Sequence, residues 1–360
     1  MFHVWKLLIL IGISCRTLYA VYEDEEEPNC FTLTDETCPN ENITFWFYTN
    51  TILEGRQLWM HNLSDAGFLP RKPLKVLLHG FHGNRDKLPN NKLRLLLTSQ
   101  NYHVISPDFR NLSVEPCYSQ AVDNAKYVGR CLAHLLTQLV QDRLIFEEDL
   151  HLIAFGLGAH IAGFAGNFMP ENIPLQRITA LNPAKPLFLG TDNADKLDSS
   201  DAKFVDVIHT DVLMLGLLNA VGHVDFYVNM GISQPNCGDI STITTHYCYH
   251  NRAVAYYAES ITTPKGFFGY RCPTYRSFLD GLCKPSNDVE QMGFYVRLGA
   301  RGLYFLETDY FAPYAMGRNH MNLSHEIKNR TYIPPDFLDG FLDEKNQTSS
   351  DTDTEGINSI

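Results

Sequence analysis

Long apolar runs are scarce in this chain of 360 residues. No stretch reaches the roughly 18 uninterrupted apolar residues that a membrane-spanning helix needs. The apolar run from Leu7 to Cys15 is too short for a span, and it lies between Lys6 and the small residue Ala20. This order is typical of a secretory signal peptide. We therefore expect residues 1–20 to be removed and the mature protein to be secreted, with no membrane span.

Basic residues are also few. The chain has 29 Lys and Arg against 41 Asp and Glu, which gives a formal net charge of −12. Loss of residues 1–20 would remove Lys6 and Arg16 and no acidic residue, leaving 27 against 41 and a net charge of −14. Such a surface argues against nucleic acid and anionic membranes as partners. Solubility alone accounts for a charge of this sign.

Cysteine pairs with the C-x-x-C spacing of zinc sites are absent, and we expect neither a metal nor a cofactor. Nine cysteines are present, and eight remain once Cys15 leaves with the signal peptide. An even number fits disulfides formed in an oxidising compartment. Pairing of sequence neighbours is the simplest of the roughly one hundred connectivities that eight cysteines allow. It predicts the disulfides Cys30–Cys38, Cys117–Cys131, Cys237–Cys248 and Cys272–Cys283.

Both ends of the chain differ in composition from the middle. Residues 21–29 form an acidic segment, and we expect residues 331–360 to be an acidic tail without fixed structure. One domain is expected over residues 30–330. Six N-x-S/T sequons fit a glycosylated secreted chain. They begin at Asn42, Asn62, Asn111, Asn322, Asn329 and Asn346.

Strand and helix patterns alternate along the domain. We expect strands at 75–79, 102–106, 150–154, 177–181 and 203–209, and helices at 119–141, 158–168 and 248–260. The first of these helices carries apolar residues on one face. Alternation of this kind predicts an α/β fold in which helices flank a mostly parallel sheet.

The stretch LIAFGLGAHIAGFAG, from Leu152 to Gly166, lacks one residue that its pattern requires. Its apolar run, small-residue turn and helix start match the strand–turn–helix that presents the nucleophile in G-x-S-x-G sequences. Gly156 stands where the serine would be. A non-glycine residue in that strained turn costs about 1–3 kcal/mol, and glycine carries no such cost. Gly156 therefore fits a chain in which selection for the hydroxyl has lapsed.

Further stretches follow in a recognisable order. LLHGF (77–81) has the form of an oxyanion loop, AFGLGAH (154–160) resembles G-H-S-L-G-A-H, and ITALNPAKP (178–186) resembles I-T-G-L-D-P-A-x-P. DAKFVDVIHTD (201–211) and CYHNRAVAYYAESI (248–261) come next. Together they resemble the animal pancreatic-lipase family, which includes triglyceride lipases, sn-1 phospholipases and the non-catalytic yolk proteins of flies. The resemblance covers residues 30–325 and implies a single α/β-hydrolase domain.

The resemblance implies a catalytic triad that is broken twice. The nucleophile position is Gly156, the acid position is Asn182, and His250 is the one triad residue retained. Asp211, which closes the strand pattern that follows, is a possible substitute acid for His250. Loss of the acid alone costs about 10⁴ in rate in such triads.

Two other features follow from the resemblance. The backbone N–H groups of Phe81 and Leu157 would form the oxyanion hole, because backbone donors need no particular side chain. The lid would be the segment between Cys237 and Cys248, whose ten residues GDISTITTHY resemble the short lids of phospholipases. Too few residues follow Leu323 for a C-terminal β-sandwich, so a colipase-type partner would lack its platform.

The sequence thus predicts a secreted lipase-like protein that is not an enzyme. It would bind a lipid or another apolar ligand, or serve as a storage or secretion-fluid protein. An active extracellular carboxylic ester hydrolase, acting on phospholipid or triglyceride through non-standard residues, is the alternative. No nucleic-acid partner is expected, and the sequence indicates no particular protein partner.

Overall fold

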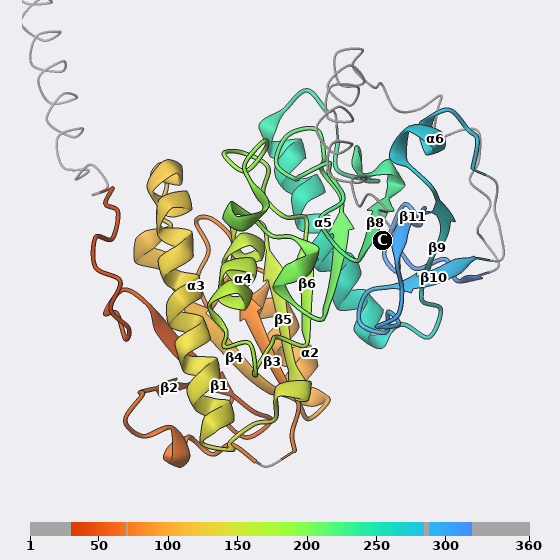
Figure 1. Cartoon of the computed structure of the whole chain (residues 1–360). Helices are drawn as coiled ribbons and strands as arrows, with labels where there is room; N and C mark the ends of the chain where they lie inside the picture. The colour runs from red at the N-terminus through yellow and green to blue at the C-terminus, as the bar shows by residue number, and fades with distance from the viewer. Residues whose placement is uncertain (1–29, 70, 239, 284–287, 319–360) are drawn as a thin grey trace, which may run out of the picture.

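A single large β-sheet organises the chain (Figure 1). The structure is a computed structural model, and it describes residues 30–69, 71–238, 240–283 and 288–318. The expected signal peptide, the acidic segment 21–29 and the tail 331–360 lie outside the described residues. So do the sequons at Asn322, Asn329 and Asn346, whereas Asn62 and Asn111 are exposed and Asn42 is half-buried.

The sheet has eleven described strands in the order β10-β9-β11-β8-β7-β6-β5-β3-β4-β1-β2. The seven strands that stand next to one another in the sheet from β11 to β4 all run parallel. Antiparallel strands close both edges. The strands are β1 Thr44–Tyr48, β2 Arg56–Leu58, β3 Leu74–Leu78, β4 His103–Asp108, β5 Leu150–Phe155, β6 Arg177–Leu181, β7 Phe204–His209, β8 Val224–Val228, β9 Phe267–Cys272, β10 Val289–Met292 and β11 Gly302–Leu306.

Helices cover both faces of the sheet. Side chains of a strand alternate between faces, and in β3 Val76 and Leu78 pack in the same cluster as α3 and α4. Leu77 points to the opposite face, into the cluster that contains α2 and α5. The mostly parallel sheet of an α/β-hydrolase domain is therefore confirmed. The described helices are α2 Asn90–Ser99, α3 Tyr118–Gln141, α4 Leu157–Phe168, α5 Ile243–Thr262 and α6 Tyr275–Leu279.

Most of the expected elements are confirmed within one or two residues, and β6 matches its predicted range. The helix expected at 248–260 is different, because α5 already begins at Ile243. The Thr242 side chain explains the earlier start, since its hydroxyl accepts the N–H of Thr245 at 3.2 Å. Such an N-cap stabilises the first turn of a helix.

The disulfide prediction is half right. Cys237–Cys248 and Cys272–Cys283 are bonded as expected. The other four cysteines pair differently, as Cys30–Cys117 and Cys38–Cys131. The predicted Cys117–Cys131 bond is geometrically excluded, because helix α3 begins directly after Cys117 and contains Cys131. At 1.5 Å per residue these positions lie about 20 Å apart, whereas a disulfide needs Cα atoms within about 7 Å.

The N-terminal segment instead runs along α3 as a strap (Figure 1). Leu33 donates its N–H to Asn124 Oδ1 at 2.8 Å, and Asn124 Nδ2 returns a bond to the carbonyl of Phe31 at 3.0 Å. The two disulfides lie on either side of these bonds, each with a Cα–Cα distance of 5.3 Å.

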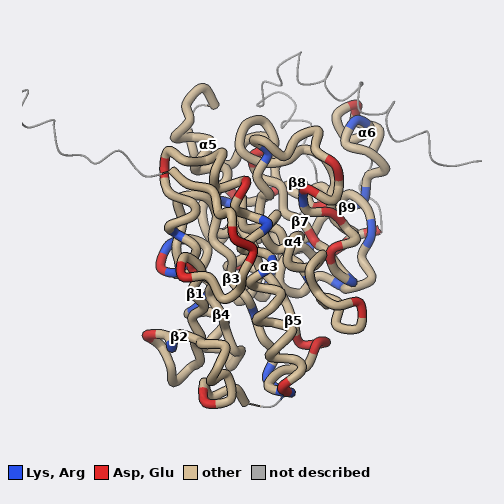
Figure 2. Tube along the Cα trace, turned by 60° about the vertical axis from the view of Figure 1, so that its left-hand side comes forward, with Lys and Arg blue, Asp and Glu red and all other residues tan. Residues whose placement is uncertain are grey.

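The described residues provide neither a membrane span nor a metal cluster. No helix among them is both long and apolar enough to cross a bilayer. Nor do three or more of their His, Cys, Asp or Glu side chains gather in a group that could hold a metal ion. Figure 2 shows acidic and basic residues interspersed along the chain in this view.

Candidate active site

A sharp turn at Gly156 joins the end of β5 to the start of α4. Gly156 has φ 56° and ψ −118°, a conformation that L-residues rarely adopt. Its N–H bonds the carbonyl of Leu181 at 3.1 Å, at the end of the neighbouring strand β6. The turn therefore lies at the carboxyl end of the parallel strands, where α/β sheets place their sites.

The side of Gly156 that a side chain would occupy faces His250. A Cβ atom built on Gly156 would lie 3.0 Å from Nε2 of His250 and 3.9 Å from Cα of Gly80. His250 comes from α5 and packs its ring against Phe155, with centroids 4.3 Å apart. Three segments far apart in the sequence thus meet at this turn, and the retained histidine points into it.

Asn182, directly after β6, holds the other ring nitrogen of His250. Its Nδ2 lies 2.6 Å from Nδ1 of His250. Its Oδ1 accepts the backbone N–H groups of Thr210 and Asp211, at 2.9 and 3.0 Å. Asn182 is fully buried, and a Cβ on Gly216 would lie 2.5 Å from its amide. The amide is therefore enclosed, with its oxygen toward the backbone and its NH₂ group toward His250.

This orientation decides the tautomer of His250. The amide oxygen faces two N–H donors, so the amide cannot turn over without setting its NH₂ group against them. Nδ1 must then accept a hydrogen bond, and in a neutral imidazole the proton lies on Nε2. Burial lowers the pKa of His250 to about 3, which keeps the ring neutral. The ring presents an N–H donor to Gly156, whereas a general base would present a lone pair.

Asp211 does not take the place of the missing acid. Its Oδ1 lies 2.8 Å from Nδ1 of His246, one helical turn before His250 on α5, and its Oδ2 accepts the N–H of Leu215 at 3.2 Å. Burial raises the pKa of Asp211, and the bond to His246 opposes this rise. The structure corrects the expectation from sequence: Asp211 holds His246, and Asn182 holds His250. No motif in the sequence marks His246 as part of the site.

The loop 80–83 lies across the turn and presents the N–H of Phe81. The N–H groups of its neighbours are used, since His82 donates to Ser113 and Gly83 donates to Gly80. Among the described residues no acceptor bonds the N–H of Phe81. Leu157 opens α4, where the first N–H groups of a helix have no intrahelical partner. Both backbone donors expected from the sequence therefore line the same site.

His79, directly before the loop 80–83, holds this loop through both of its ring nitrogens. Its Nδ1 lies 2.9 Å from the carbonyl of Gly80, its Nε2 accepts the N–H of Phe109 at 3.3 Å, and its ring stacks on Phe109 at 3.6 Å. Burial lowers the pKa of His79 to about 4. A neutral histidine with both nitrogens bonded makes the loop a rigid part of the site.

A cavity of about 790 Å³ opens above the turn. Its described lining contains no serine, threonine or cysteine. The apolar lining residues are Phe81, Leu88, Phe155, Leu157, Ala184, Pro186 and Leu215. No motif in the sequence marks the polar lining residues, which are His82, Lys87, Asn91, Glu115, Tyr118, Tyr247 and Asn251.

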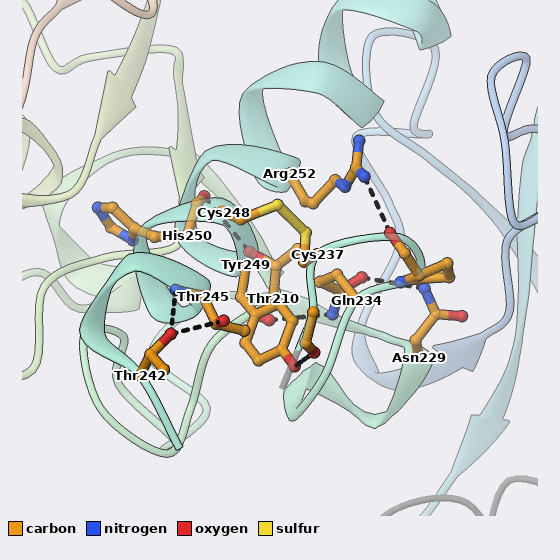
Figure 3. Close-up of a disulfide and its surroundings, with 12 residues drawn as sticks. Thr210, Asn229, Gln234, Cys237, Thr242, Thr245, Cys248, Tyr249, His250 and Arg252 are labelled. Carbon is orange, nitrogen blue, oxygen red and sulfur yellow. Dashed lines mark hydrogen bonds between the residues drawn. A yellow bond between two sulfur atoms is a disulfide. The ribbon is translucent and has the colours of Figure 1, made fainter. Parts of the chain in front are cut away.

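The segment expected to be the lid is short and anchored (Figure 3). The Cys237–Cys248 disulfide ties it to α5, and in Figure 3 the His250 side chain points away from this bond. The residues just before the segment are held as well, since Arg252 donates to the carbonyl of Pro235 at 2.9 Å and Gln234 Nε2 donates to that of Thr210 at 2.9 Å. The segment leaves the exposed ring of Tyr247 at the cavity rim.

Comparison with known proteins supports the resemblance. The profile of the lipase family matches residues 18–314. Pancreatic triacylglycerol lipase of Myocastor coypus is 34% identical over 280 residues, which cover 71% of this chain and 60% of the relative. Pancreatic lipase-related protein 2 of Cavia porcellus is 34% identical, covering 68% and 57%, and lipase member H of Danio rerio is 32% identical, covering 79% and 64%.

The matched regions span about 60% of the length of these curated relatives. A solved sugar hydrolase from Lactococcus lactis is similar at 14% identity and a TM-score of 0.32, with coverage of 62% of this chain and 77% of that one. The family profile covers most of the chain, and the sheet, the elbow turn and the retained histidine lie within it. The chain therefore belongs to the lipase family, in the group of the pancreatic lipases.

Proposed function

We propose that this protein is a secreted, non-catalytic member of the lipase family that binds an apolar ligand in the cavity above Gly156. One observation carries the proposal: the position facing Nε2 of His250 offers no side-chain atom. Covalent ester hydrolysis begins with attack by an activated hydroxyl or thiol, and the described cavity lining contains none from serine, threonine or cysteine.

The size of the expected loss supports this assignment. Removing the nucleophile of a serine hydrolase lowers kcat by about a millionfold. Binding and the oxyanion hole alone leave a rate about 10³–10⁴ above that in water. His250 does not rescue activity by activating water, because its Nε2 is a donor and its pKa of about 3 makes it a weak base.

The cavity is suited to binding without turnover. Its volume of about 790 Å³ falls in the range of about 300–1,000 Å³ that is usual for ligand sites. Each buried methylene contributes about 0.8 kcal/mol before ordering costs. Burial of a chain of about fifteen methylenes contributes about 12 kcal/mol, which leaves the roughly 8 kcal/mol of micromolar affinity after association costs of about 4 kcal/mol.

Secretion is supported by the disulfides. Four are present among the described residues, and such bonds persist in oxidising compartments. A storage or secretion-fluid role without a ligand is an outcome of the binding test below.

The absence of turnover is tested with the purified secreted protein. We expect no labelling by a serine-directed phosphonate, and no hydrolysis of phosphatidylcholine or triolein above a boiled control. Hydrolysis that scales with protein concentration would overturn the proposal. If it persisted in His250→Ala, the chemistry would lie outside the triad; if it were lost, the vestigial site would be active.

Binding is tested by titration with a fluorescent fatty acid. We expect saturable binding at micromolar concentration to the wild type, and loss of binding in Gly156→Phe, whose ring would fill the space before His250. Leu215→Trp narrows the cavity from another wall without a strained backbone. Gly299→Phe is the matched control, because a Cβ at this exposed glycine meets no atom within 4 Å. Absence of saturable binding to the wild type, or equal binding to Gly156→Phe, would leave the storage role.

A further inference from the structure

We infer that the ligand head group at Gly156 is a carboxylate, so that the cavity takes long-chain free carboxylic acids in preference to their esters and alcohols. The inference rests on the proposed function, because it specifies the head of the apolar ligand proposed above. It is carried by three hydrogen-bond donors on residues that line one cavity: the N–H groups of Phe81 and Leu157, and Nε2–H of His250.

The residues that carry the three donors, Phe81, Leu157 and His250, line the same cavity, next to the position that a side chain on residue 156 would occupy. That position lies 3.0 Å from Nε2 of His250 and 3.9 Å from Cα of Gly80, which precedes Phe81. Leu157 supplies the next peptide N–H along the chain, at the positive end of the α4 dipole. A ligand oxygen beside this position, in van der Waals contact with Cα of Gly156, is within hydrogen-bond reach of Nε2, and the missing side chain leaves it room.

Asn182 converts His250 from acceptor to donor. With an aspartate at position 182, Nδ1 would carry the proton and Nε2 would present a lone pair. With Asn182, whose oxygen is held by Thr210 and Asp211, Nδ1 accepts and Nε2 donates. A lone pair at Nε2 would repel a carboxylate oxygen, and an N–H attracts it. The exchange therefore changes which head group the site prefers.

A carboxylate matches three donors better than related head groups do. Its two oxygens offer about four acceptor sites and no donor. An ester carbonyl offers one oxygen at this point, and an alcohol brings a donor of its own. Hydrogen bonds to an ionised acceptor are also roughly twice as strong as neutral ones. Selectivity for the acid over the ester follows.

Charged groups at the cavity rim do not oppose this preference. Glu115 is the acidic residue in the described lining, and its carboxylate lies 4.0 Å from Nδ1 of His82, with both side chains more than half exposed. Lys87 also lines the cavity and donates to the carbonyl of His82 at 3.2 Å. A cation and a solvated acid thus share the rim.

The inference is tested by competition. A fluorescent fatty acid bound to the purified full-length protein is displaced by oleate, methyl oleate or oleyl alcohol, each below its aggregation concentration, at pH 8. We expect oleate to bind at least tenfold more tightly than the other two. His250→Phe removes the donor without adding charge and should abolish this preference, so that oleate and methyl oleate bind the variant with affinities within about twofold of each other. Gly299→Phe should behave as the wild type.

Asn182→Asp supplies an independent arm, with nitrogen-15 spectra of the imidazole as its readout. We expect the proton of His250 on Nε2 in the wild type and on Nδ1 in Asn182→Asp, together with at least tenfold weaker oleate binding. If the wild type binds none of the three ligands, the proposed function fails. If it binds all three equally, or if His250→Phe keeps the preference for oleate, the proposed function stands and the carboxylate inference is overturned.

Discussion

Two departures at the site are chemically linked at the scale of single residues. Gly156 removes the hydroxyl that a general base would deprotonate, and Asn182 removes the carboxylate that would make His250 a base. Either change alone leaves a half-built triad. Together they give a neutral imidazole that donates into an apolar cavity, which is a consistent arrangement for binding.

Restoring the serine alone should not restore an esterase. In Gly156→Ser the new Cβ lies 3.0 Å from Nε2 of His250, and Nε2–H cannot accept the serine proton while Asn182 occupies Nδ1. We expect ester hydrolysis to stay within about tenfold of the wild type in the single variant. The double variant Gly156→Ser, Asn182→Asp should be faster by about 10³-fold or more, since a wrong tautomer costs about 10⁴ in rate. Release of p-nitrophenol from p-nitrophenyl butyrate measures both rates.

The single variant Gly156→Ser should also be less stable than the wild type. The backbone of residue 156 is at φ 56°, where a side chain costs about 1–3 kcal/mol. Urea unfolding of Gly156→Ser against the wild type measures the loss. Ordinary lipase rates in the single variant would contradict the tautomer assigned to His250.

The positions of the site residues could be predicted from sequence, and the partner of Asp211 could not. Motif positions located Gly156, Asn182 and His250, and all three meet in the structure. The sequence could not show which histidine Asp211 contacts, because His246 and His250 lie one turn apart on α5. The choice depends on the path of the loop after Asp211, which Lys185 fixes by donating to the carbonyls of Val212 and Leu213.

At the scale of elements, burial decides which strands the sequence reveals. β5 and β6 are buried along their whole length, so their apolar runs are plain. β8 is also fully buried but contains Asp225, whose charge interrupts the pattern. The interruption is compensated by His209 of β7, with Nε2 2.8 Å from Asp225 Oδ1. β2 and β10 lie at the sheet edges with mixed exposure.

β4 begins with a histidine that its surroundings do not satisfy. His103 is buried edge-on against Phe47 and Phe68, with centroids 5.1 and 5.8 Å away. Neither ring nitrogen has a hydrogen-bond partner among the described residues. Burial lowers the pKa of His103 to about 4. The folded state therefore takes up a proton here at lower pH than the unfolded chain, whose histidines titrate near about 6.5.

Replacing this histidine should stabilise the protein, and more so in acid. We expect His103→Leu to raise the free energy of unfolding by about 1 kcal/mol at pH 7.5, since an unsatisfied polar group is removed. As the pH falls from about 6.5 toward 4, protonation of the unfolded chain costs the wild type up to about 1.4 kcal/mol per pH unit, and the variant is spared this loss.

Urea unfolding at pH 7.5, 6 and 5 checks this prediction. His134→Leu, a change of the same residue type on the exposed side of α3, is the matched control. A difference between His103→Leu and the wild type that stays constant or shrinks toward pH 5 would show that His103 is protonated or bonded in the folded state.

At the scale of the whole molecule, two disulfides act as one clamp. Cys30–Cys117 and Cys38–Cys131 have sequence separations of 87 and 93 residues. Once one bond has formed, the other closes a much shorter path, along positions 30 to 38 and 117 to 131. The loop-closure entropy removed from the unfolded chain depends on this path. The two contributions are therefore coupled, as nearest-neighbour pairing would not have been.

Removing both bonds should cost more than the sum of the single removals. With a path of about 24 residues, loss of either bond alone costs about 3.4 kcal/mol. Loss of the second, which closes a loop of more than about 85 residues, then costs about 4.7 kcal/mol, for a total near 8 kcal/mol. Urea unfolding of variants in which both cysteines of one bond, or all four cysteines, are replaced by serine should measure a coupling of about 1 kcal/mol between the two bonds.

The Cys272–Cys283 bond, which closes its own separation of 11 residues, is the control, and the stability lost on its removal should add independently to the other losses. Strictly additive losses, or non-reduced peptides that join Cys30 to Cys38, would contradict the clamp, because neighbour pairing closes two separate loops and neither bond then shortens the loop of the other.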